Sequence, residues 1–195
     1  MKNKMKYIFL IGSLYYIIME AISAFGFHDS IINTYTIHTI SELGIPGVSQ
    51  FSFLMNSAFI VIGLTLLFGS YFVLKDYIVK NNLIFHALVI IASVGVIIVG
   101  LVHGGNPLTS GYHTLGAVMA ILGGNLLLVI LSKSMANFGK YQKFTLFLGI
   151  MGLLFFWIMF FNMDNIYMPV LERASVYTLI LWNFMTGIFL ANNNI

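Results

Sequence analysis

The chain has 195 residues, of which 59% are apolar and only 8% are charged, whereas about a quarter of the residues of an average soluble domain are charged. The composition therefore indicates an integral membrane protein. The absence of cysteine excludes disulfides, thiolate nucleophiles, iron–sulfur clusters and cysteine-type zinc sites. The net charge of +3 is the difference between nine basic and six acidic residues. The basic residues flank the apolar runs, so the charge does not indicate a protein that binds nucleic acid.

Six apolar runs are long enough to cross a bilayer, which takes roughly 20 residues in a helix. We predict an all-α integral membrane protein, a six-helix transmembrane bundle that forms one domain over residues 1–195. The first run has the flanks of a secretory signal, but it contains Glu20 and lacks a small-residue cleavage site, so we expect it to be the first helix. The predicted helices cover residues 7–25, 51–74, 83–102, 112–132, 144–162 and 175–191.

Basic residues divide the connections between these runs into two kinds. The eight lysines precede the first run or lie between the second and third or the fourth and fifth, whereas Arg173 is alone on the other side. Connections rich in Lys and Arg stay in the cytoplasm, so we expect cytoplasmic termini and a multi-pass protein of the plasma membrane. The lysines are Lys2, Lys4, Lys6, Lys75, Lys80, Lys133, Lys140 and Lys143.

The predicted outer side collects most of the ionisable residues. Its longest connection, residues 28–50, joins the first two helices, and a loop of this length in a compact domain is usually functional. We expect it to lie on the membrane surface, with a turn at Ser41 and Glu42. The other outer ionisable residues include His28, Asp29, His38, His103, His113, Asp164 and Glu172.

Two histidines, His103 and His113, flank a short turn between the third and fourth runs. Small residues four apart let helices approach closely in lipid, so we expect these runs to form a tight hairpin with both imidazoles at its outer mouth. The small residues are Gly100 and Gly104 in the third run and Gly116, Ala120 and Gly124 in the fourth.

Three interpretations of this histidine pair remain open. Each imidazole bonds a helix-end carbonyl or a water; or both contribute to a polar pocket with Glu42 and Asp164; or they bind a metal. Zinc accepts two histidines and a carboxylate, which makes His103 and His113 the metal candidates. No His-Glu-x-x-His motif is present, and the sequence requires no cofactor.

Glu20 is the carboxylate inside the first run. A charged side chain within a spanning helix costs several kcal/mol, so such residues face the bundle interior and are functional by default. The alternative is a position near enough to the interface to be hydrated. Trp157 and Trp182, by contrast, are expected to face lipid or the interface.

Several short strings resemble the small six-helix membrane proteins of archaea and bacteria known as domain of unknown function 998. The resemblance extends from about residue 30 to 187 and implies the six-helix fold but no biochemistry. The family often has Phe-Pro where the third helix ends; here His103-Gly-Gly-Asn-Pro107 replaces it, so no role of His103 follows from the family. The strings are Ile40-Ser-Glu-Leu-Gly44, His113-Thr-Leu-Gly-Ala117, Gly124-Asn125-Leu126, Glu172-Arg173 and Leu181-Trp182.

We predict an outer-face polar pocket that binds a lipid or other amphipathic ligand, or a role as accessory subunit of a larger membrane complex. Partners would be membrane lipids, or other membrane subunits on the small-residue helix faces. The alternatives are a hydrolase or transferase on lipid-linked substrates, metal-dependent or not, with Glu20, Glu42 and His113 as catalytic candidates, and a proton-coupled carrier that uses Glu20. The ligand-binding candidates are His38, Ser41, Glu42, His103, Asn106, His113, Asp164 and Arg173.

Overall fold

The computed structural model describes residues 7–135 and 138–192. They form seven α-helices and two short 3₁₀ turns. Six of these helices are long and apolar enough to cross a membrane, which confirms the predicted all-α fold of a multi-pass membrane protein. The elements are α2 (Ile8–Phe25), α3 (Ile31–Thr36), η1 (Ser41–Gly44), α4 (Ser52–Phe72), η2 (Leu74–Tyr77), α5 (Asn82–Leu101), α6 (Ser110–Ser134), α7 (Lys140–Phe160) and α8 (Met168–Asn192).

The largest difference from the predicted boundaries is at α8, which begins at Met168 rather than at residue 175. Pro169 is compatible with this start because a proline in the first turn of a helix removes no needed hydrogen bond. The polar pair Glu172 and Arg173 thus lies on a helix and not in a loop, and this difference positions the site described below.

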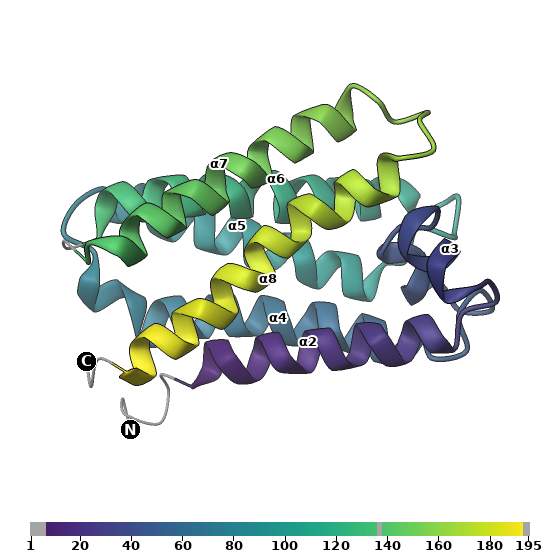
Figure 1. The fold of residues 1–195 in the computed structure, drawn as a ribbon, viewed down its shortest axis with the longest axis horizontal. Coiled ribbons are helices and arrows are strands. Elements are labelled where there is room, and N and C mark those ends of the chain that lie inside the picture. The colour runs from purple at the N-terminus through teal and green to yellow at the C-terminus, as the bar shows by residue number, and fades with distance from the viewer. Residues whose placement is uncertain (1–6, 136–137, 193–195) are drawn as a thin grey trace.

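The six long helices form a ring. Each packs mainly on its neighbours in the chain, and α8 closes the ring against α2. α2 begins and α8 ends at one end of the bundle, whereas α3 lies at the other (Figure 1). We call residues 26–51, which contain α3 and η1, the cap, and the end that carries them the cap end.

The predicted α5–α6 hairpin is present and depends on a glycine that the sequence analysis did not select. A Cβ on Gly95 would lie 2.6 Å from the backbone nitrogen of Ala120 and 2.7 Å from the carbonyl oxygen of Gly116, so only glycine fits. Gly100 lies instead against the backbone of α4, and Gly124 against Leu179 of α8. The small residues of α5 and α6 therefore pack against other helices of the same chain.

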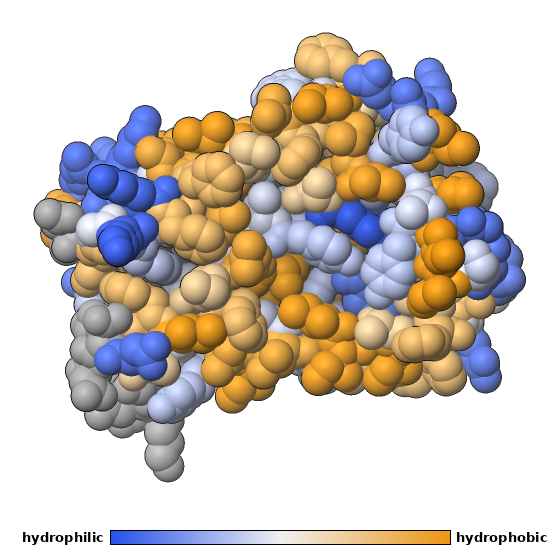
Figure 2. Space-filling view, viewed as in Figure 1, coloured by the Kyte–Doolittle hydropathy of each residue, from blue (hydrophilic) through white to orange (hydrophobic). Residues whose placement is uncertain are grey.

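The surface is divided as a membrane protein requires. Figure 2 shows hydrophobic residues over the middle of one face and hydrophilic residues gathered at its two ends. The described lysines all belong to the end opposite the cap, because η2 and the α6–α7 connection lie there: Lys75, Lys80, Lys133, Lys140 and Lys143. The predictions from Lys2, Lys4 and Lys6 lie outside the described residues.

Candidate functional site: a cavity beneath a polar cap

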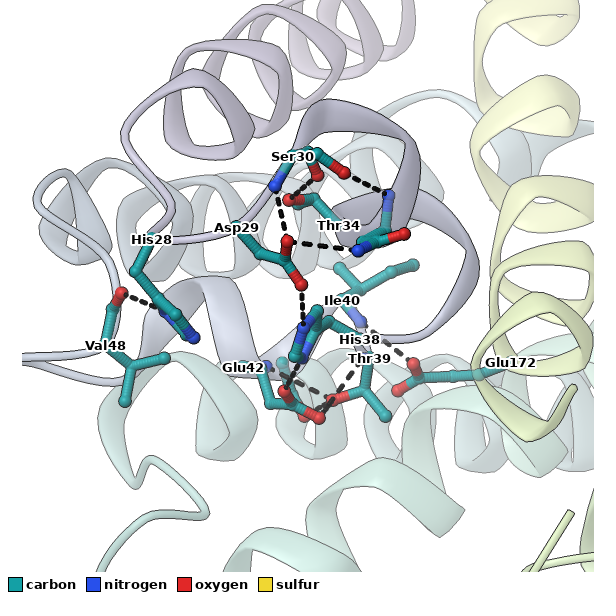
Figure 3. Close-up of polar contacts among 12 residues, drawn as sticks. His28, Asp29, Ser30, Thr34, His38, Thr39, Ile40, Glu42, Val48 and Glu172 are labelled. Atoms are coloured by element: carbon teal, nitrogen blue, oxygen red, sulfur yellow. Dashed lines mark hydrogen bonds and ion pairs between the residues drawn. The ribbon is translucent and has the colours of Figure 1, made fainter. Parts of the chain in front are cut away.

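The cap is held together by a histidine between two carboxylates (Figure 3). Nδ1 of His38 lies 2.7 Å from Oε2 of Glu42, and Nε2 lies 3.1 Å from Oδ2 of Asp29. Ionised carboxylates only accept hydrogen bonds, so His38 donates to both of them when its ring is protonated to the imidazolium. Both ring nitrogens therefore have carboxylate partners, and in this arrangement His38 links Asp29 to Glu42 within the cap.

Local sequence explains why these groups meet. The Ser30 side chain accepts from the backbone N–H of Asn33 and so caps α3, as serine commonly does at a helix start. The carboxylate of Asp29 accepts from the N–H of Ser30 at 2.6 Å. In the next turn, Glu42 accepts from the N–H of Thr39 at 3.2 Å. Each carboxylate is therefore oriented by a backbone hydrogen bond as well as by the imidazole.

The pKa values of this network shift in opposite directions. Partial burial by itself lowers the pKa of His38, but its hydrogen bonds to Glu42 and Asp29 outweigh burial and raise that pKa above the usual 6.5. The backbone N–H of Ser30 and then the His38 imidazole hold the pKa of Asp29 below the usual 3.8. The charged forms of both groups thus stabilise the folded cap.

Two adjacent residues of helix α8 bind the cap. Arg173, only 4% exposed, donates from Nη1 to the carbonyl of His38 and from Nη2 to the carbonyl of Thr34 at 2.9 Å. Glu172 accepts from the backbone N–H of Ile40 at 2.9 Å. A guanidinium and a carboxylate one residue apart therefore satisfy both kinds of backbone group in the cap.

Glu20 belongs to the same cluster. It is 3% exposed, which favours the interpretation that it faces the bundle interior over the hydrated interface. Its Oε1 accepts from the hydroxyl of Tyr177 at 2.6 Å and lies 3.9 Å from Nε of Arg173. The ion pair of Arg173 is thus formed with α2 and not with its neighbour Glu172.

Beneath the cap, an apolar cavity of about 80 Å³ occupies the centre of the helix ring. Side chains from α2, α4, α5, α6 and α8 line it, and nearly all of them are apolar. Ser41 and Glu172 line it where it meets the cap. Most of its wall consists of Phe59, Ile62, Leu66, Ala92, Val96, Val99, Ala117, Ala120, Ile121, Leu127, Leu128, Val176, Leu179 and Ile180.

Three polar atoms of cavity-lining residues are buried without a hydrogen-bond partner among the described residues. They are the hydroxyl of Tyr16, Oδ1 of Asn183 and Nε1 of Trp182, although the Trp182 side chain also interacts with the hydroxyl of Tyr141. Buried polar groups are nearly always hydrogen-bonded, so an unpaired group points to water or to a ligand. The cavity therefore combines apolar walls with a few unsatisfied polar groups.

The other predicted site residues do not converge on this cavity. Nδ1 of His113 lies 2.6 Å from the carbonyl of Val102, the helix-end hydrogen bond of the first interpretation above. Nδ1 of His103 is buried without a partner among the described residues. Asn106 accepts from the N–H of Leu108 within its own turn, and Asp164 is exposed in the α7–α8 connection.

The metal interpretation gains no support from this geometry. Within residues 7–135 and 138–192, no three or more His, Asp or Glu side chains are grouped so that they could hold a metal ion. Of the predicted ligand-binding residues, the structure brings together His38, Ser41, Glu42 and Arg173, with Glu20 beside them.

The predicted lipid-facing position was wrong for one of the two tryptophans. Trp157 is 45% exposed, as expected, but Trp182 is fully buried and lines the cavity. Thr178 and Thr186, one turn before and after Trp182, are buried as well. Polar residues at i−4 and i+4 in a lipid-embedded helix mark its inward face, and this signal could have placed Trp182 inside the bundle.

Comparison with known proteins gives one match. A family model described as "Protein of unknown function (DUF998)" matches residues 11–188, which include every residue of the cap, the cluster and the cavity named above. No curated protein and no solved structure matches the chain.

Proposed function

The chain belongs to the family described as "Protein of unknown function (DUF998)". Because that description names no activity or ligand, we propose a function from the geometry alone. We infer that this multi-pass membrane protein binds a single-chain amphipathic molecule of the lipid type. The chain of that molecule would occupy the central cavity, and its polar head would lie beneath the cap.

The observation that carries this proposal is the cavity itself. Ligand sites are concave and mostly apolar, with a small number of polar groups that fix orientation. Here the wall is almost entirely aliphatic and aromatic, and Ser41 and Glu172 stand at the cap end. Each methylene moved into such a wall contributes about 0.8 kcal/mol, so a short run of them supports binding without any charge pairing.

The size of the cavity favours one chain over two. One water needs about 10–15 Å³ of such space, so a cavity of about 80 Å³ holds several groups of that size. Two cavity-lining residues, Tyr16 and Asn183, have a buried polar atom without a hydrogen-bond partner among the described residues, which favours a ligand with hydroxyl groups over a saturated hydrocarbon alone.

The roles as enzyme and as accessory subunit receive less support. His38 and Glu42 are hydrogen-bonded within the cap, and neither lines the cavity. The small-residue stripes expected to contact other subunits pack within the chain, as Gly100 and Gly124 show. No specific contact favours either alternative over ligand binding.

We also propose that the cap faces the outside of the plasma membrane. The described lysines lie at the opposite end, and positive charge marks the cytoplasmic side. Because the chain has no cysteine, single cysteines report orientation cleanly. In intact cells a membrane-impermeant maleimide should label Asp164→Cys and not Lys80→Cys; the reverse pattern contradicts the orientation.

Ligand binding is tested through Trp182. In a Trp157→Phe variant it is the remaining tryptophan, because the chain has two. A long-chain alcohol with a doxyl group on its chain should quench Trp182 saturably, and unlabelled alcohol should reverse the quenching. A Trp182→Phe variant, which keeps the lipid-facing Trp157, reports quenching from the bulk bilayer.

A matched pair of substitutions locates the binding. Ala117→Phe fills the cavity, which Ala117 lines, whereas Ala87→Phe adds the same side chain at an exposed position of α5. Saturable quenching should disappear in the first variant and persist in the second. Quenching that is never saturable, or that Ala117→Phe leaves unchanged, contradicts the proposal.

A further inference from the structure

The seam between α2 and α8 opens toward the cap. Near the opposite end the two helices touch closely: a Cβ on Gly187 would lie 2.6 Å from the backbone nitrogen of Leu10. From there α8 crosses the bundle obliquely and separates from α2 (Figure 1). Of the six pairs of neighbours in the ring, α2 and α8 make the least contact.

A groove of about 470 Å³ lies along this seam. Figure 2 shows the same face hollowed between its middle and the cap end, with hydrophilic residues in the depth of the hollow. The walls are mostly apolar, and all the lining residues except Tyr35 belong to the candidate spans α2 and α8. The groove is lined by Ile17, Glu20 and Ala21 of α2, Tyr35 of α3, and Tyr177, Ile180, Leu181 and Phe184 of α8.

The groove and the central cavity share a wall residue. Ile180 lines both and is only 6% exposed, so its side chain forms part of the partition between the groove and the cavity. The polar cluster also touches both spaces, because Glu20 lines the groove and Glu172 lines the cavity. Apolar and polar parts of one molecule could therefore pass side by side.

We propose that this seam is a lateral portal through which the amphipathic ligand enters the central cavity from the bilayer, past Ile180. The inference rests on the proposed function and names the route and the ligand class. The chain slides between Ile17, Ala21 and Leu181, while the head travels along Glu20 and Tyr177 toward the cap.

The charges along this route select the head group. Glu20 lies 3.9 Å from Arg173, so the pair is balanced and offers no net attraction to a fixed charge. Carboxyl groups at the groove and at the cavity accept hydrogen bonds from a donor and oppose an anion. An uncharged head with hydroxyl groups, as in a long-chain alcohol or a monoacylglycerol, fits better than a fatty acid.

The test measures how fast the doxyl-labelled alcohol quenches Trp182 after rapid mixing with protein in lipid nanodiscs. Ala21→Phe obstructs the groove and leaves the cavity lining intact, since Ala21 lines only the groove. Quenching and its reversal should both slow at least tenfold while the final extent stays the same. Ala87→Phe, exposed on α5, should keep the wild-type rate.

A second variant guards against poor folding of the first. Leu181 is 45% exposed, and Leu181→Ala widens the groove, so it should accelerate quenching severalfold. Equal rates in Ala21→Phe, Leu181→Ala and Ala87→Phe, with saturable binding intact, would overturn the portal alone. Loss of saturable binding in the wild type would overturn the proposed function instead. A doxyl-labelled fatty acid that binds as tightly as the alcohol would overturn the head-group assignment.

Discussion

Replacing Arg173 by methionine is the sharpest test of how the cap is held on the bundle. The side chain is 4% exposed and donates to the carbonyls of His38 and Thr34. Methionine fills a similar volume but donates nothing. The two carbonyls lose their donor, and the carboxylate of Glu20, which is 3% exposed, loses the opposite charge 3.9 Å away.

The size of the effect follows from these losses. Removing one partner of a buried ion pair costs about 3–5 kcal/mol, because the other charge stays buried and uncompensated. For a chain of 150–250 residues each kcal/mol lowers Tm by roughly 2–4 °C, so Arg173→Met should unfold roughly 6–20 °C below the wild type. Lys133→Met removes an exposed cation and should change Tm little.

A double-variant cycle separates charge from packing. Glu20→Gln keeps an oxygen for the hydroxyl of Tyr177 but removes the charge, so the double variant should be more stable than the sum of the single effects implies. The coupling should lie between about 0.5 and 3 kcal/mol. Thermal unfolding of the four proteins in one detergent provides the values. Strict additivity, or an Arg173→Met variant with the Tm of Lys133→Met, would refute this account of the cap.

Two further predictions concern the cap and the helix ring. Because the pKa of His38 is raised in the folded cap, its stabilisation is complete below pH 6.5 and is lost as pH rises through the pKa of the folded state. Because the pKa of Asp29 is lowered, its stabilisation is lost as pH falls below 3.8. Hydrogen-exchange protection of residues 29–44, corrected for intrinsic rates, should thus peak between these limits, and its alkaline decline should vanish in His38→Gln. Gly95→Leu should destabilise the bundle by about 1–3 kcal/mol through overpacking, which would be measured as a lower Tm. The added methyl of Gly111→Ala meets open space, so this variant should keep the wild-type Tm. Equal Tm values for the two variants would contradict the tight α5–α6 contact.

Most of the fold could be predicted because it depends on patterns that are local in sequence. Six apolar runs specify six helices, and lysine placement sorts the connections. The start of α8 could not be found this way: Glu172 and Arg173 look like loop residues until the cap supplies Ile40, Thr34 and His38 as buried partners.

The site could be predicted only in part. Topology alone indicated that His38, Glu42 and Arg173 share one side of the bundle, but it could not pair them. His113 looked equally suited to a pocket, and only the position of the Val102 carbonyl gives it a structural hydrogen bond. The cavity left no mark in the sequence, because it is lined by ordinary apolar residues from five helices that meet only in the folded chain.

The most direct test of ligand binding is native mass spectrometry of the protein released from membranes under mild conditions, with Ala117→Phe and Ala87→Phe measured beside the wild type. The wild type and Ala87→Phe should carry one single-chain, uncharged amphiphile per protein, and Ala117→Phe should carry none, because its added ring occupies the same space. Wild-type protein without any such adduct, or equal adducts in all three proteins, would contradict the central claim.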